Sequence, residues 1–81
     1  MSTFQLTIAT VDKNLFSGEA YSLVCPGREG ELTVLAHHMP FITILEKGEL
    51  RVKKEKDAPV EVFPVTRGLL EVSKEGAVVL L

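Results

Sequence analysis

The chain has 81 residues, which leaves room for one small domain built around a single hydrophobic core. Hydrophobic residues make up 46% of the sequence and charged residues 25%, as in globular rather than disordered proteins. A formal net charge of −2 and the absence of Trp argue against a protein that binds nucleic acid or anionic lipid. We therefore expect a single domain over residues 1–81 and no nucleic-acid partner.

Membrane insertion and secretion are not predicted either. The longest apolar run, 77–81, is far shorter than the roughly 20 residues that span a bilayer. Residues 1–5 lack the basic-then-apolar order of a signal peptide, and the single cysteine, Cys25, has no partner for an internal disulfide. These features favour a reducing, cytoplasmic environment.

The first part of the chain is predicted to form strands. Apolar side chains recur at every second position within 3–11 and again within 21–25, which is the period of a strand with one buried face. Pro26 and Gly27 end the second run with turn chemistry. The intervening segment 15–18 is too short and too closely bounded by glycine to form a helix.

Two runs rich in β-branched and large apolar residues follow, at 31–35 and 41–45, with a loop at 36–40 between them. The run 41–45 is apolar on both faces. We therefore expect a second sheet or a partner to cover its outer side.

The last part of the chain is predicted to form two hairpins. Alternation along 50–53 leads into a charged turn and a return strand over 60–65, in which Pro64 lacks an N–H and favours an edge strand or a bulge. A tight turn at 73–76 then joins two final strands, the second of which is the apolar run 77–81. Such an ending indicates either that the last strand is internal to a sheet or that something normally follows it.

Turn signals thus recur about every eight to twelve residues, and no window has the 3.6-residue period of a helix. The sequence predicts an all-β fold, either a sandwich or a barrel.

The inventory of reactive side chains is thin. His37 and His38 are adjacent, so they point in opposite directions on extended backbone, and only Cys25 and Glu31 are near enough in sequence to complete a zinc site. We interpret the histidines as ordinary loop residues and Cys25, on the inward side of its strand, as a buried hydrophobe. The Gly-bounded segment 27–31 has no following helix and is interpreted as a turn. No catalytic residue, metal site or cofactor is predicted.

The order of several motifs nevertheless carries a resemblance. The motifs, in chain order, are Phe4-x-Leu6-x-Ile8, Leu15-Phe16-Ser17-Gly18-Glu19-Ala20, Val24-x-Pro26-Gly27-x-x-Gly30-Glu31-Leu32-x-Val34-Leu35, His38-x-Pro40-Phe41-x-Thr43-x-Leu45-x-x-Gly48 and Gly68-x-Leu70-Glu71-Val72. From about residue 4 to residue 81, this pattern resembles the N-terminal domain of the epsilon subunit of bacterial F-type ATP synthases.

The resemblance implies a flattened β-sandwich of two sheets, with about eight to ten short strands. It also implies a non-catalytic rotor subunit in the central stalk, which links the gamma subunit to the polar loops of the membrane c-ring and couples ion translocation to ATP synthesis or hydrolysis. The expected location is peripheral, on the cytoplasmic face of the inner membrane, without direct insertion.

Two groups of contact residues are implied by the same resemblance. The residues expected to face the c-ring are Arg28, Glu29, Gly30, Glu31 and His38. The residues expected to face gamma are Thr10, Ile42 and Thr43.

The chain departs from the family pattern in one loop and in length. Ala36 and His37 stand where the family usually has Pro-Gly, and the loss of one fixed and one permissive φ angle predicts a different loop path. The two C-terminal helices found in most members are absent from these 81 residues, as expected for a naturally short epsilon chain or for one cut at the domain boundary. We therefore expect neither nucleotide binding nor inhibition by an extended helix.

A different class of protein fits the composition and strand count equally well. It is a free-standing β-sandwich adaptor or small-ligand carrier unrelated to the synthase, since fold alone does not determine function. Binding of the gamma subunit distinguishes the two hypotheses.

Overall fold

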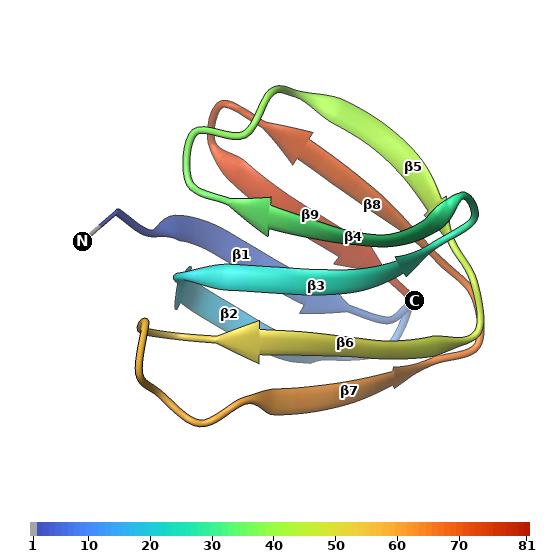
Figure 1. Ribbon diagram of the computed structural model, residues 1–81. Helices are drawn as coiled ribbons and strands as arrows, with labels where there is room; N and C mark the ends of the chain where they lie inside the picture. The colour runs from blue at the N-terminus through green and yellow to red at the C-terminus, as the bar shows by residue number, and fades with distance from the viewer. Residues whose placement is uncertain (1) are drawn as a thin grey trace.

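Nine β-strands and no helix are found in residues 2–81, the part of the chain that this computed structural model describes (Figure 1). The strands are β1 (Phe4–Ala9), β2 (Asn14–Ala20), β3 (Ser22–Gly27), β4 (Gly30–Leu35), β5 (Phe41–Leu45), β6 (Gly48–Lys53), β7 (Glu61–Val65), β8 (Gly68–Ser73) and β9 (Gly76–Leu80). The predicted all-β class and the expected number of strands are confirmed. No helix in the described residues is long and apolar enough to cross a bilayer.

The strands follow the order β2-β1-β9-β8-β5-β3-β6-β7, and β4 pairs with the free side of β3. All pairs are antiparallel except the parallel pair β1 and β9. Between β5 and β3 only Gly27 and Leu45 are in register, so the sheet folds over at this point. The result is a first layer, β2-β1-β9-β8-β5, and a second layer, β4-β3-β6-β7, which lies in front of it in Figure 1.

Alternate residues of each strand form one core between the layers. The buried hydrophobic side chains are Leu6, Ile8, Ala20, Leu23, Cys25, Val34, Leu45, Leu50, Val52, Val65, Leu70, Val72, Ala77 and Val79. Burial of such side chains contributes roughly 1.5–3 kcal/mol for each large one, which is the main favourable term in folding. The apolar residues at alternate positions of the sequence are therefore the ones whose burial holds the two layers together.

An aromatic contact closes the side of the sandwich opposite the fold-over point. Phe16 on β2 and Phe63 on β7 meet edge to face, with ring centroids 6.2 Å apart and an interplanar angle of 82°. The Lys54 ammonium lies 5.9 Å from the Phe16 ring centroid and 3.4 Å from a carboxylate oxygen of Glu61. The two edge strands are thus joined by side chains rather than by backbone hydrogen bonds.

Several local expectations are confirmed and one element is added. Pro64 lies in β7, which pairs only with β6 and is an edge strand. The last strand is internal, because β9 lies between β1 and β8, and Ser73 pairs with Gly76 across the expected tight turn. Segment 15–18, for which the sequence only excluded a helix, belongs to strand β2.

The backbone of Gly76, at the start of β9, has a positive φ and lies very close to strand β1. Its φ is +138°, and a Cβ atom there would lie 2.1 Å from the carbonyl oxygen of Gln5 on the neighbouring strand β1. We expect Gly76→Ala to lower the free energy of unfolding by about 2 kcal/mol or more, because both the backbone conformation and the strand contact are disturbed. Urea denaturation measures the change.

Gly30→Ala is the matched control. Gly30 also has a positive φ, of +124°, but nothing lies within 4 Å of its Cβ position, so only the conformational cost of about 1 kcal/mol is expected. Equal losses in the two variants would show that the contact with β1 is unimportant.

Candidate functional site

The described residues contain no arrangement typical of a catalytic centre. No group of three or more His, Cys, Asp or Glu side chains in residues 2–81 is placed to hold a metal ion. No polar or charged side chain in this range is buried. His37 and His38 are both exposed. The surfaces of the sandwich, rather than its interior, are therefore the candidate functional site.

Cys25 is a core residue and not an exposed thiol. It is fully buried on β3, and burial raises the pKa of its thiol from 9.0 to about 12. The nucleophilic thiolate is therefore strongly disfavoured near neutral pH. This agrees with its interpretation as a buried hydrophobe.

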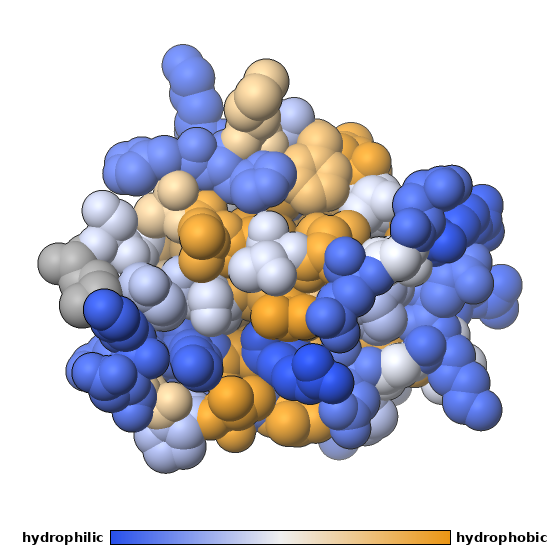
Figure 2. Space-filling view, in the orientation of Figure 1, coloured by the Kyte–Doolittle hydropathy of each residue, from blue (hydrophilic) through white to orange (hydrophobic). Residues whose placement is uncertain are grey.

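The residues expected to face the c-ring begin at the β3–β4 turn. Arg28 and Glu29 form its two-residue tip, between Gly27 and Gly30. The Arg28 Nε–H donates to Glu46 Oε2 at 3.0 Å, and both side chains are about half exposed. Hydrophilic residues gather at this end of the molecule, on the right of Figure 2.

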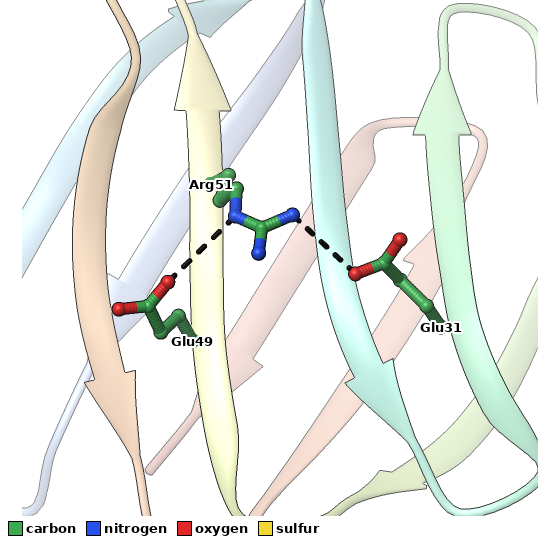
Figure 3. Close-up of polar contacts among 3 residues, drawn as sticks. All are labelled: Glu31, Glu49 and Arg51. Atoms are coloured by element: carbon green, nitrogen blue, oxygen red, sulfur yellow. Dashed lines mark hydrogen bonds and ion pairs between the residues drawn. The ribbon is translucent and has the colours of Figure 1, made fainter.

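Glu31 belongs to a second charged group, on the outer side of the second layer. Arg51 Nη1 lies 3.4 Å from Glu31 Oε2, and Arg51 Nε lies 3.7 Å from Glu49 Oε1 (Figure 3). Glu49 lies two residues before Arg51 on the same strand, whereas Glu31 lies on β4, so one guanidinium on β6 joins a carboxylate of its own strand to one on the far side of β3. Exposed ion pairs of this kind contribute about 0–1 kcal/mol, so the group sets surface charge more than stability.

The structure does not bring His38 close to the β3–β4 turn. His38 lies in the loop after β4, whereas Arg28 precedes β4, and a six-residue strand separates its ends by roughly 17 Å. The His38 ring packs against Phe41 at 5.1 Å between centroids, and its Nδ1 lies 3.1 Å from the carbonyl oxygen of Met39. With His37 it lines a cavity of about 520 Å³ at that end of the sandwich.

The three residues expected to face gamma do not lie on one surface of the sandwich. Thr10 lies in the β1–β2 turn, where its hydroxyl oxygen accepts hydrogen bonds from the backbone N–H groups of Asp12 (3.2 Å) and Lys13 (3.1 Å). Ile42 is 65% exposed on the outer side of β5. Thr43 is half-buried and points to the other side of that strand.

Ile42 is part of a larger apolar surface on the first layer. Strand register places Ile44, Leu69 and Leu80 in one row across β5, β8 and β9. Ile42 and Val78 lie in the next row on the same outer side. These five side chains, which are 36–65% exposed, define the outer apolar face. The outer side of the run 41–45 is thus not covered by the second layer.

Sequence reasoning missed Leu69, Val78 and Leu80. The signal was present, because 69–70 and 78–80 are apolar at consecutive positions, as 41–45 is. Consecutive apolar residues on a strand point to both of its faces. In an internal strand such as β9 the second face is the outer surface of the molecule.

His37 adopts an unusual backbone conformation in the loop after β4. Its φ is +65°, the left-handed region that glycine occupies easily and other residues do not. His37 stands where the family that the sequence resembles usually has the glycine of a Pro-Gly pair. The loop therefore keeps a left-handed residue there, although a histidine has to adopt it.

We expect His37→Gly to raise the free energy of unfolding by about 0.5–1 kcal/mol, because relief of left-handed strain outweighs the added freedom of the unfolded chain. His38→Gly is the control, because His38 has no positive φ and should only lose stability. Urea denaturation of both variants measures the difference, and a loss of stability in His37→Gly would contradict the strain.

Cys25 is expected to resist alkylation in the folded protein. Iodoacetamide at pH 8 should label it slowly in buffer and quickly in guanidinium chloride, because only the unfolded thiol ionises readily. Because the folded pKa is the higher one, stability should also fall as pH rises from about 9 towards 12. Equal labelling rates in the two solvents would show that the thiol is accessible.

Comparison with known proteins identifies the family. The family model described as the ATP synthase delta/epsilon chain β-sandwich domain matches residues 3–81. An ATP synthase epsilon chain of Sulfurimonas denitrificans is 41% identical over 81 residues, which are all of this chain and 62% of that one. That of Caulobacter vibrioides is 36% identical over 80 residues, covering 99% of this chain and 91% of that one.

Solved structures agree on the fold. A chain of the Euglena gracilis mitochondrial ATP synthase superimposes with a TM-score of 0.86 at 21% identity, over 96% of this chain and 49% of that one. A chain of the Tetrahymena thermophila enzyme does so with a TM-score of 0.81 at 15% identity, over 98% and 63%.

The chain spans about half the length of several curated relatives that it matches, among them the epsilon chain 1 of Methylococcus capsulatus (43% identity, 86% of this chain, 49% of that one). The expectation of a non-catalytic synthase subunit agrees with these names, and an adaptor unrelated to the synthase does not. This chain belongs to the β-sandwich domain family of ATP synthase delta and epsilon chains.

Proposed function

We propose that this chain is a non-catalytic subunit of the central stalk of an F-type ATP synthase. In this role it links the gamma subunit to the membrane c-ring and couples ion translocation to ATP synthesis or hydrolysis. It is peripheral, on the cytoplasmic face of the inner membrane, and it turns with both partners. Family membership supports the assignment, as do the two solved relatives, which come from structures described as an OSCP/F1/c-ring assembly and a central stalk/c-ring assembly.

The outer apolar face is the observation that carries the proposal. Contiguous apolar surface on a small protein is typical of a contact with another protein. The face lies on the side of β5 that presents Ile42, one of the residues expected to face gamma. Burying it against the gamma subunit removes this surface from water. We therefore assign the first layer to gamma.

The c-ring contact is proposed for residues 28–31, at the charged end of the sandwich. Arg28, Glu29 and Glu31 are exposed there, and such groups set the orientation and specificity of a contact more than its affinity. His38 lies at the opposite end of β4, so ring loops that contact both it and residues 28–31 have to extend along the length of that strand. Thr10 lies at the charged end as well. The residue before it, Ala9, pairs with Leu80, and Leu80 pairs with Leu69, which is adjacent to the fold-over point.

A coupling element has to transmit torque without deforming. Close-packed protein interiors have low compressibility, and here both layers share one core and are joined on both sides. The sandwich therefore acts as a stiff body between the two partners.

The experiment is gel filtration of this chain mixed with the gamma subunit of the same organism. We expect a stable complex with the wild-type chain, and a weakening of about 100-fold or more with Ile42→Asp, because an unpaired carboxylate would be buried in the outer apolar face. Val62→Asp is the matched control, since Val62 is 50% exposed on β7, in the second layer. A wild-type chain that elutes alone at micromolar concentrations would overturn the proposal.

A further inference from the structure

One carboxylate lies within the outer apolar face, between Ile42 and Val78. Glu71 on β8 pairs with Ile42 on one side and with Val78 on the other, and Leu69 precedes it on the same side of its own strand. Side chains directly opposite each other on neighbouring strands have Cβ atoms about 4.5–5.5 Å apart. The exposed Glu71 therefore has aliphatic side chains on three sides, and Ser73 follows it on the same side of β8.

Glu71 differs from the acidic residues of the second layer. The ion pairs found among residues 2–81 use Glu31, Glu46, Glu49 and Glu61. Within the same part of the chain, Glu71 takes part in no ion pair and no side-chain hydrogen bond. In the isolated chain its charge is stabilised by water.

Any partner that covers the face removes that water. A buried carboxylate without a hydrogen-bonded counter-charge is strongly unfavourable, so a purely apolar partner would bind poorly here. A Lys or Arg in the partner surface would compensate the charge, and Arg would do so with two parallel hydrogen bonds.

The same charge disfavours a second copy of this chain as the occupant. A twofold contact places the same patch on both subunits, so a dimer centred on this face would bring two Glu71 carboxylates together. Like charges brought together in an interface oppose binding and act as a specificity device.

We propose that Glu71 determines the specificity of the outer apolar face. The gamma subunit covers this face with aliphatic side chains grouped around one Lys or Arg, which pairs with the Glu71 carboxylate. This inference rests on the proposed function, and it adds the chemistry by which the partner is recognised. It gives a role to the one charged residue of the motif at 68–72.

Titration calorimetry of the gamma subunit with Glu71→Gln tests the inference. We expect the Kd to rise about tenfold or more relative to the wild-type chain, and further with Glu71→Lys, because a like charge then faces the cation of the partner. Salt should weaken binding of the wild-type chain more than binding of Glu71→Gln. Glu75→Gln, in the exposed β8–β9 turn, is the control and should change the Kd by less than about twofold.

The outcomes separate this inference from the proposed function. A Glu71→Gln variant that binds gamma as tightly as the wild-type chain overturns the role of Glu71 and leaves the stalk assignment standing. A wild-type chain that does not bind gamma overturns the stalk assignment itself. Sedimentation that shows a wild-type dimer broken by Glu71→Lys would identify a second copy as the occupant and overturn the inference.

Discussion

The two layers of the sandwich are joined by backbone at one corner, and this corner determines where every other surface lies. Gly27 is in register with Leu45 there, and backbone hydrogen bonds of 2.8 and 3.1 Å flank the pair. A Cβ atom on Gly27 would lie 2.8 Å from the Gly30 carbonyl oxygen and 2.8 Å from a side-chain carbon of Leu32, so the tight β3–β4 turn beside this corner requires glycine. Because the sheet folds over at this point, its two inner faces form one core and its two outer faces become separate surfaces.

The two outer faces differ in chemistry. Strands β5, β8 and β9 of the first layer present aliphatic side chains beside one carboxylate, Glu71, whereas the second layer presents a guanidinium shared by two carboxylates, Glu31 and Glu49. The first surface gains free energy mainly by leaving water, and the second remains well solvated. A body with one face of each kind has a built-in orientation, because only the first layer favours extensive contact.

Local features of the fold could be predicted from the sequence, but the pairing of strands that are distant in the sequence could not. The alternation in 3–11, the tight turn at 73–76 and the edge position of Pro64 all depend on neighbouring residues, and all agree with the structure. The parallel pairing of β1 with β9 joins the two ends of the chain and leaves no local signal. The same holds for the distance between His38 and Arg28, which depends on the direction of β4.

The sequence pattern of a single strand predicts only part of the candidate site. A run that is apolar on both faces, such as 41–45, already indicates that its outer side contacts something. Whether several such runs share one surface depends on register between strands that are more than 20 residues apart in sequence, as Ile42 and Glu71 are. A one-residue slip of β8 would turn Glu71 into the core and Leu70 out to solvent. The burial of Leu70 and Val72 in the core therefore keeps the Glu71 carboxylate on the apolar face, between Ile42 and Val78.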